Sequence, residues 1–173
     1  MTKEQFEGSD DDGRFIHEGI YVGPRSDKRM SHTVLTDMLF RKEIRGPAFH
    51  RWRAVATGRP VGLTGKINLK KLGREHMLRW HSDGEKDWVL CAVVYLHDDG
   101  RPEYGGRRMM QRRDGGIDHI DPLCNRLVLF DPQSNINHAV EPMMEATGDW
   151  ARLNYIAWFY QQTESEKSTC QPS

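Results

Sequence analysis

The chain has 173 residues, 37% of them hydrophobic and 29% charged, and its 25 Lys and Arg residues balance 25 Asp and Glu residues. This length suits a single domain with a substantial core. No apolar run approaches the roughly 20 residues that a membrane span requires, so we expect no membrane association. Cys91, Cys124 and Cys170 are an odd number without close spacing, which argues against a disulfide framework and favours a reducing, cytoplasmic setting.

The charge is distributed unevenly. Residues 21–79 hold 14 Lys and Arg against 4 Asp and Glu. Such a stretch is either a solvated basic face or a surface that attracts an anionic substrate, a carrier protein or a nucleic acid. No nucleic-acid-binding motif accompanies the basic residues, so we expect no nucleic-acid partner.

The first third of the chain favours helices. Residues 1–14 and 163–173 are polar and predict disordered ends around one domain, residues 15–162. Residues 15–23 alternate in the manner of a short strand, whereas residues 31–45 and 49–58 have the composition and spacing of helices.

The remainder of the chain favours strands. Apolar, β-type runs are divided by turns rich in Gly, Asp and Pro. The predicted strands cover residues 63–69, 87–97, 105–113, 125–132, 137–143 and 152–161. Many short strands after a helical start predict a mainly β fold, a sandwich or barrel with the N-terminal helices packed outside.

One short motif suggests a metal site. His81 and Asp83 flank a single residue, so on an extended backbone both side chains project to the same face. Imidazole and carboxylate are suitable ligands for Fe(II) and similar metals. The pair alone is better explained by an ordinary surface turn, and a metal site needs a third ligand from elsewhere.

The third ligand we favour is His138, which follows the apolar run 127–130. Two histidines and one carboxylate can occupy one face of an octahedral iron and leave the other face open. Arg152 begins the last predicted strand and is the only Lys or Arg between His138 and Lys167. A guanidinium can bind a carboxylate bidentately, so Arg152 is a candidate anchor for an organic acid as well as an ordinary strand-end arginine.

Six motifs in order complete this pattern: HSD, VVYLHDD, EYGG, RLVLFDP, NHAVEPM and RLNYIAWFY. Together, over about residues 62–161, they resemble the Fe(II)/2-oxoglutarate-dependent dioxygenases, in particular the prolyl-hydroxylase-like branch. The resemblance implies a double-stranded β-helix (jelly-roll, cupin-like) core that uses Fe(II), 2-oxoglutarate and O2. It also implies that His81, Asp83 and His138 bind the iron and that Arg152 binds the distal carboxylate of 2-oxoglutarate.

The same resemblance suggests further roles. Tyr95 matches a tyrosine that hydrogen-bonds this carboxylate, although a half-buried core tyrosine is the alternative. Gly105 and Gly106 match a pair that lets the sheet pass close to the site, and we expect Trp158 to pack in the core.

Two departures from the family pattern stand out. The gap between His138 and Arg152 is several residues longer than usual. The strand before the metal pair offers Asn68, Lys70 or Lys71 where a tyrosine is usual, so the remaining cosubstrate contacts are open.

The expected activity is hydroxylation, or another oxidation, of a C–H bond with release of succinate and CO2. A small metabolite, amino acid or biosynthetic intermediate is the expected substrate, because the chain offers no separate peptide-binding module. The alternatives are a peptidyl (prolyl-type) hydroxylase, a carrier-protein-bound substrate, and a non-catalytic jelly-roll binding protein. No substrate-binding residue is predicted.

Overall fold

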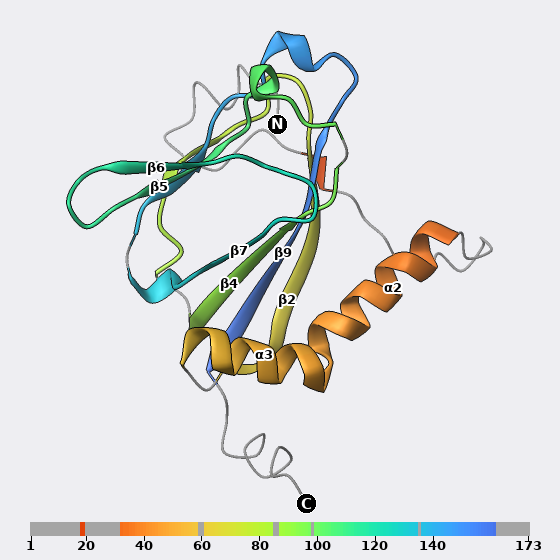
Figure 1. Ribbon diagram of the computed structural model, residues 1–173, viewed down its shortest axis with the longest axis vertical. Helices are drawn as coiled ribbons and strands as arrows, with labels where there is room; N and C mark the ends of the chain where they lie inside the picture. Colours follow the sequence, from red (N-terminus) through yellow and green to blue (C-terminus); the bar gives the residue numbers. More distant parts are fainter. Residues whose placement is uncertain are drawn as a thin grey trace, which may run out of the picture.

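A computed structural model describes residues 18–19, 32–58, 61–84, 87–97, 99–134 and 136–161. Two antiparallel β-sheets lie face to face, and two helices cover the outer side of the larger sheet (Figure 1). This arrangement is the predicted jelly-roll core with helices outside. The predicted ends, residues 1–14 and 163–173, and most of the predicted strand 15–23 lie outside the described residues.

The two helices are α2 (His32–Arg45) and α3 (Pro47–Thr57), close to the predicted ranges. Pro47 occupies the first turn of α3, where its fixed φ suits a helix start and its missing N–H costs nothing. Gly58 ends α3 with a φ of 64°, a left-handed conformation that favours glycine. No helix in the described part of the chain has the length and apolar character needed to cross a membrane.

The larger sheet has five strands, and its centre is β9, which pairs with β2 on one side and β4 on the other. In spatial order the strands are β1 (Glu18–Gly19), β2 (Val61–Leu72), β9 (Arg152–Gln161), β4 (Trp88–Tyr95) and β7 (Leu127–Phe130). Four of them confirm predicted strands, and β2 is longer than predicted at both ends.

The smaller sheet contains two strands that the sequence did not predict, β3 and β6. Its spatial order is β3 (Leu78–His81), β8 (His138–Val140), β5 (Arg108–Gln111) and β6 (Ile117–Ile120). β6 lies where a turn was expected. It is a mostly exposed edge strand with the sequence IDHI, so it lacks the apolar face that identifies a strand from sequence. Short 3-10 helices occupy Pro102–Tyr104, Pro132–Ser134 and Glu145–Thr147.

The main apolar core lies between the five-stranded sheet and the helices. Alternate residues of β2, β9 and β4 point to this side and pack with Phe40 and Phe49 of the helices. Phe40 stacks on Tyr155 with ring centroids 4.1 Å apart. The Tyr155 hydroxyl donates to Asp37, and Arg41 binds both Asp37 and, at 2.7 Å, the carbonyl of Ile67. These contacts fix α2 against the sheet.

Smaller apolar clusters lie between the two sheets. One contains Cys91, Val93 and Tyr95 of β4, with Ile156 and Trp158 packed against it. The other contains Leu72, Val140 and Met143. Between these clusters the inner faces of the sheets become polar and leave a cavity.

Candidate active site

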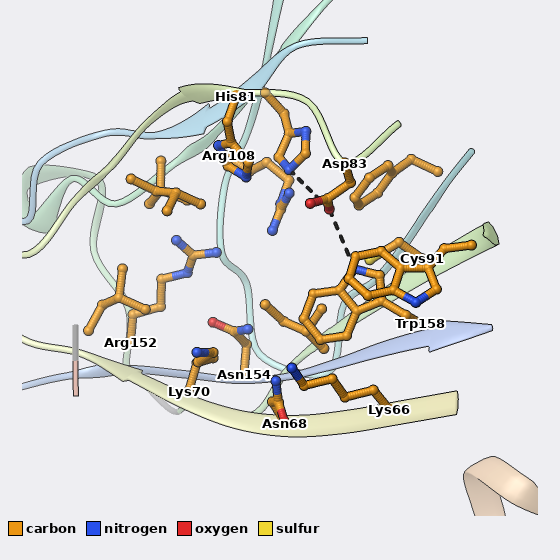
Figure 2. A pocket seen from close by; sticks show the side chains of 17 residues that line it. Lys66, Asn68, Lys70, His81, Asp83, Cys91, Arg108, Arg152, Asn154 and Trp158 are labelled. Carbon is orange, nitrogen blue, oxygen red and sulfur yellow. Dashed lines mark hydrogen bonds and ion pairs between the residues drawn. The ribbon is translucent and has the colours of Figure 1, made fainter. Parts of the chain in front are cut away.

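The cavity has a volume of about 270 Å³ and is lined by both sheets. Its polar lining comes from the inward positions of β2 and β9, from β5, and from the region of β3 and β8 (Figure 2). The polar and charged lining residues are Lys66, Asn68, Lys70, His81, Asp83, Arg108, His138, Arg152 and Asn154. All three predicted metal ligands and the predicted Arg152 therefore meet in one cavity.

His81, Asp83 and His138 form a compact cluster at one side of this cavity. One ligand atom from each lies within 4.8 Å of the others, and no other group of this kind occurs among the residues that the structure describes. His81 and His138 are direct partners in the β3–β8 pair, and their rings lie 4.2 Å apart. The His138 Nε2 atom is 3.7 Å from Asp83 Oδ2.

A register shift in β3 turns His81 inward. Leu78 pairs with Val140 and His81 with His138, so three steps along β3 match two steps along β8. A bulge of this kind re-aims a side chain that regular alternation would place on the opposite face. Both Leu78 and His81 consequently line the cavity.

The protonation states of the cluster suit a metal. The carbonyl of Arg79 lies 2.8 Å from His81 Nδ1, and such a contact holds the proton on Nδ1 and leaves Nε2 as the ligand atom. Burial, with the positive charge of Arg108 and the neighbouring His81, lowers the pKa of His138 to about 2. His138 is thus a neutral imidazole at neutral pH, the form that binds metals.

Trp158 has a second role beside core packing. Its indole Nε1 donates to Asp83 Oδ2 at 3.4 Å, and its ring lies 5.0 Å from that of Trp88. The sequence predicted only the packing role. A hydrogen bond of this type orients a metal-binding carboxylate from outside the ligand set.

Arg152 lies in the part of the cavity away from Asp83 (Figure 2). Its side chain is buried, at 1% exposure. Its Nη2 donates to the Tyr95 hydroxyl at 3.2 Å, whereas its Nε and Nη1 atoms have no hydrogen-bond partner within the described residues. A buried guanidinium with unpaired nitrogens carries a large desolvation cost, which a bound anion offsets.

Tyr95 contacts Arg152 through both its hydroxyl and its ring. Its ring is fully buried, and the guanidinium carbon of Arg152 lies 5.0 Å from the ring centroid. Burial of Tyr95 opposes its ionisation, but the charges and hydrogen bonds of Arg152 and Arg108 outweigh it and lower the pKa of the phenol. Tyr95 is not among the residues that line the cavity, so the contact that the structure shows for its hydroxyl is with arginine.

The sequence left two buried polar groups of the cavity unpredicted. Asn154 is 1% exposed, and both polar atoms of its side chain lack a partner within the described residues. Strict alternation from Arg152 would have placed it in the cavity. Arg108 is 2% exposed, and its Nε and Nη1 are also without a described partner. No sequence signal distinguished it from the neighbouring Arg107.

β2 contributes polar side chains to the cavity. Of the three residues that the sequence offered, Asn68 and Lys70 line the cavity and Lys71 does not. Burial, and then the charge of Lys66, lower the pKa of Lys70. The two lysines of this wall, Lys66 and Lys70, both line the cavity, and the charge of Lys66 opposes that of Lys70.

Gly106 explains how the smaller sheet approaches Arg152. Its φ is 70°, and a Cβ atom there would lie 2.3 Å from Met143 Sδ and 3.6 Å from Arg152 Cδ. A side chain at this position would require Met143 to move, whereas its contact with Arg152 would be an ordinary one. Of the two glycines noted in the sequence, Gly106 therefore lies close to Arg152, whereas Gly105 lies against Pro142 and Met144.

Two other histidines near the sheets, His97 and His119, bind protein groups outside the cavity. His97 is buried and contacts the carbonyls of Leu153 and Pro122. His119 forms an exposed pair with Glu141 at 3.1 Å. Neither lines the cavity.

Iron and 2-oxoglutarate fit this set of side chains. Two imidazoles and one carboxylate are a donor set for non-haem Fe(II) that leaves positions open. The unpaired nitrogens of Arg152 provide the cation that a dicarboxylate needs at its far end.

Comparison with solved structures shows the same fold in several oxygenases. A Pseudomonas putida prolyl-4-hydroxylase matches with a TM-score of 0.60 at 18% identity, over 87% of this chain and 74% of that one. A Burkholderia pseudomallei oxidoreductase of the 2OG-Fe(II) oxygenase family matches with a TM-score of 0.60 at 12% identity, over 86% and 65%. A Trichoplax adhaerens prolyl hydroxylase, solved with a peptide fragment of hypoxia inducible factor, matches with a TM-score of 0.54 at 16% identity, over 81% and 60%.

The sequence itself gives the family. No curated protein matches the chain at a significant level. The model of the 2OG-Fe(II) oxygenase superfamily matches residues 67–160, more than half of the chain and nearly all of the two sheets. The chain therefore belongs to the 2OG-Fe(II) oxygenase superfamily and is a 2-oxoglutarate-dependent dioxygenase, with Fe(II), 2-oxoglutarate and O2 as its cofactor and cosubstrates.

Proposed function

We propose that this dioxygenase hydroxylates a C–H bond of a small acidic metabolite, amino acid or biosynthetic intermediate. His81, Asp83 and His138 bind the iron, and Arg152 binds the distal carboxylate of 2-oxoglutarate. The observation that supports these roles is that the three ligands share one cavity with the buried Arg152, whose Nε and Nη1 have no partner within the described residues.

The charge of the cavity supports a small acidic substrate. Lys66, Lys70, Arg108 and Arg152 line it, and among the described residues that line it Asp83 is the one carboxylate. Iron with Asp83 and doubly charged 2-oxoglutarate carries one net negative charge, so the four cations leave the loaded cavity positive. A substrate with an acidic group matches this field better than a neutral prolyl segment does.

The side chains around the iron have distinct tasks. When bound, iron and 2-oxoglutarate supply the oxidation: one oxygen atom of O2 enters succinate as CO2 is released, and the other becomes the substrate hydroxyl. His81 and His138 present neutral nitrogen ligands from paired strands. Trp158 holds the Asp83 carboxylate. Arg152 aligns the cosubstrate by its far end, and the facing sheets limit the access of water.

The proposed site can be tested by spectroscopy without knowledge of the substrate. Anaerobic addition of Fe(II) and 2-oxoglutarate to the protein should produce a visible charge-transfer band, and a chelator should remove it. His138→Ala should abolish the band. His119→Ala, which changes an exposed histidine outside the cavity, should keep it. Absence of the band from the wild type, or its persistence in His138→Ala, would show that the site is wrong.

A prolyl-type peptidyl hydroxylase is the second candidate, favoured by the fold that the chain shares with prolyl hydroxylases. Succinate formation should therefore be measured against paired panels: amino acids and organic acids, their neutral amides, and proline-containing peptides. We expect stimulation by acidic small molecules and little by their amides. Stimulation by peptides alone would replace our proposal with the second candidate.

A further inference from the structure

Two buried arginines enter the cavity from opposite sheets. Arg152 comes from β9 of the larger sheet and Arg108 from β5 of the smaller one (Figure 2). We propose that Arg108 is a second guanidinium for the dicarboxylate cosubstrate and that it binds 2-oxoglutarate together with Arg152. This inference rests on the proposed function and assigns a residue that the sequence motifs do not include.

The hydrogen bonding of Arg108 is incomplete in the same way as that of Arg152. Each side chain is at most 2% exposed, and each has its Nε and Nη1 atoms without a partner within the described residues. A buried guanidinium presents five N–H donors and cannot lose its charge. Two such groups in one cavity require an acceptor with several oxygen atoms and negative charge.

The two guanidinium groups lie close to each other. Both interact with the Tyr95 hydroxyl, and the charge of Arg108 contributes to lowering the pKa of Arg152. Like charges buried side by side repel, and the single oxygen of the phenol cannot satisfy the unpaired donors of both. The contact of Arg108 with the Phe130 ring, at 5.4 Å from the centroid, is a further favourable interaction but supplies no acceptor. An anion between the arginines would satisfy both.

The register of β5 puts Arg108 beside the metal cluster. Met110 pairs with the iron ligand His138, and Arg108, two residues earlier and on the same face, pairs with Val140. Its guanidinium points into the cavity between the cluster and Arg152 (Figure 2). A molecule that reaches from the three metal ligands to Arg152 would share the cavity with the Arg108 guanidinium. 2-Oxoglutarate does so and has two carboxylates for the two guanidinium groups.

Binding measurements on matched arginine variants test this inference. Affinity for 2-oxoglutarate should be measured by calorimetry on the anaerobic Fe(II)-loaded protein. Arg108→Met should bind at least tenfold more weakly, as should Arg152→Met. The control is Arg107→Met, because Arg107 lies next along the chain and forms an ion pair with Glu141 at 2.8 Å outside the cavity. It should bind within about twofold of the wild type.

Thermal unfolding separates ligand binding from a structural role. Without cosubstrate, Arg108→Met should unfold at the same temperature as the wild type or higher, because a buried, repelled charge is gone. Its stabilisation by added 2-oxoglutarate should be smaller. A structural arginine would give the reverse: a lower unfolding temperature and an unchanged affinity. Arg108→Lys, which keeps the charge but loses the planar fork, should also bind more weakly and provides a second variant if Arg108→Met does not fold.

The outcomes distinguish the inference from the proposed function. If the wild type binds no 2-oxoglutarate, the proposed function fails. If the wild type and Arg108→Met bind it equally well while Arg152→Met does not, only the inference fails. A comparison with 2-oxovalerate, which lacks the distal carboxylate, refines a positive result. Loss of affinity for both acids places Arg108 at the carboxylate next to the keto group, and loss for 2-oxoglutarate alone places it at the distal one.

Discussion

The two faces of the five-stranded sheet are built from the same strands and have opposite character. On the outer face, Ile67, Ala157 and Phe159 pack under the helices in an apolar core. On the inner face, at the alternate positions of the same strands, Asn68 of β2 and Arg152 of β9 line the cavity with other polar side chains. Because the side chains of a strand alternate between its two faces, successive residues of one strand contribute in turn to the apolar core and to the cavity.

The two faces differ most clearly in how their polar groups are satisfied. On the outer side, Asp37 accepts from both Tyr155 and Arg41. Arg53, also on this side, has its Nε and Nη1 unpaired within the described residues, but its guanidinium carbon lies only 3.8 Å from the centre of the Phe159 ring. The inner arginines form a like-charged pair beside a cavity. An unsatisfied buried group therefore indicates a ligand only when it faces space that a ligand can fill.

The largest effect should follow from a change on the outer face. Phe159→Ala removes a fully buried ring between the sheet and the helices and should lower the free energy of unfolding by about 3–5 kcal/mol. The corresponding fall in Tm is about 6–20 °C. Denaturant unfolding measures the loss.

The same variant tests whether the two faces are independent. At a temperature where Phe159→Ala is folded, its affinity for 2-oxoglutarate should match that of the wild type, because its inner face is unchanged. A large loss of affinity in the folded protein would show that the two faces are coupled through β9.

The features that the sequence predicted correctly are those that depend on strong local patterns. The alternation in β9 identified Arg152 as the start of a strand, and the spacing of His81 and Asp83 identified two candidate ligands. His138 was found because it follows an apolar run at the position where the next strand begins. Each of these signals requires only the sequence near one element and one general rule about side-chain direction.

Other features depend on pairing between distant strands. β3 and β6 are short, and their side chains are half-buried or exposed, so they carry little apolar alternation. The inward direction of His81 results from a bulge that only the β3–β8 register reveals. Arg108 and Arg107 are equivalent in sequence, and the pairing of β5 with β8 decides which one enters the cavity.

A smaller effect should follow from a change on the inner face. Tyr95→Phe removes the hydroxyl that accepts from Arg152 Nη2 at 3.2 Å but keeps the buried ring. Hydrogen bonds to charged groups contribute about 1.5–3 kcal/mol, so the affinity for 2-oxoglutarate should fall by roughly 10- to 100-fold. Calorimetric titration of the Fe(II)-loaded protein measures this change. An unchanged affinity would mean that Arg152 does not need Tyr95 for its position, and Tyr95 would then be a core residue only.

The smallest effect should come from Trp158, which takes part in both packing and the metal site. Trp158→Phe keeps an aromatic ring against Trp88 but removes the donor to Asp83 Oδ2. Partners of metal ligands typically contribute 10- to 100-fold to metal affinity. Because this hydrogen bond is long, at 3.4 Å, the affinity for Fe(II) should fall by about tenfold. Competition with a chelator measures it, and Trp88→Phe is the control for the loss of indole surface. If both variants weaken iron binding equally, the effect comes from packing alone, and the inner face would resemble the outer face at this position. If only Trp158→Phe weakens iron binding, the effect comes from the hydrogen bond between the indole N–H and Asp83, and Trp158 then serves both the packing of β9 and the metal site.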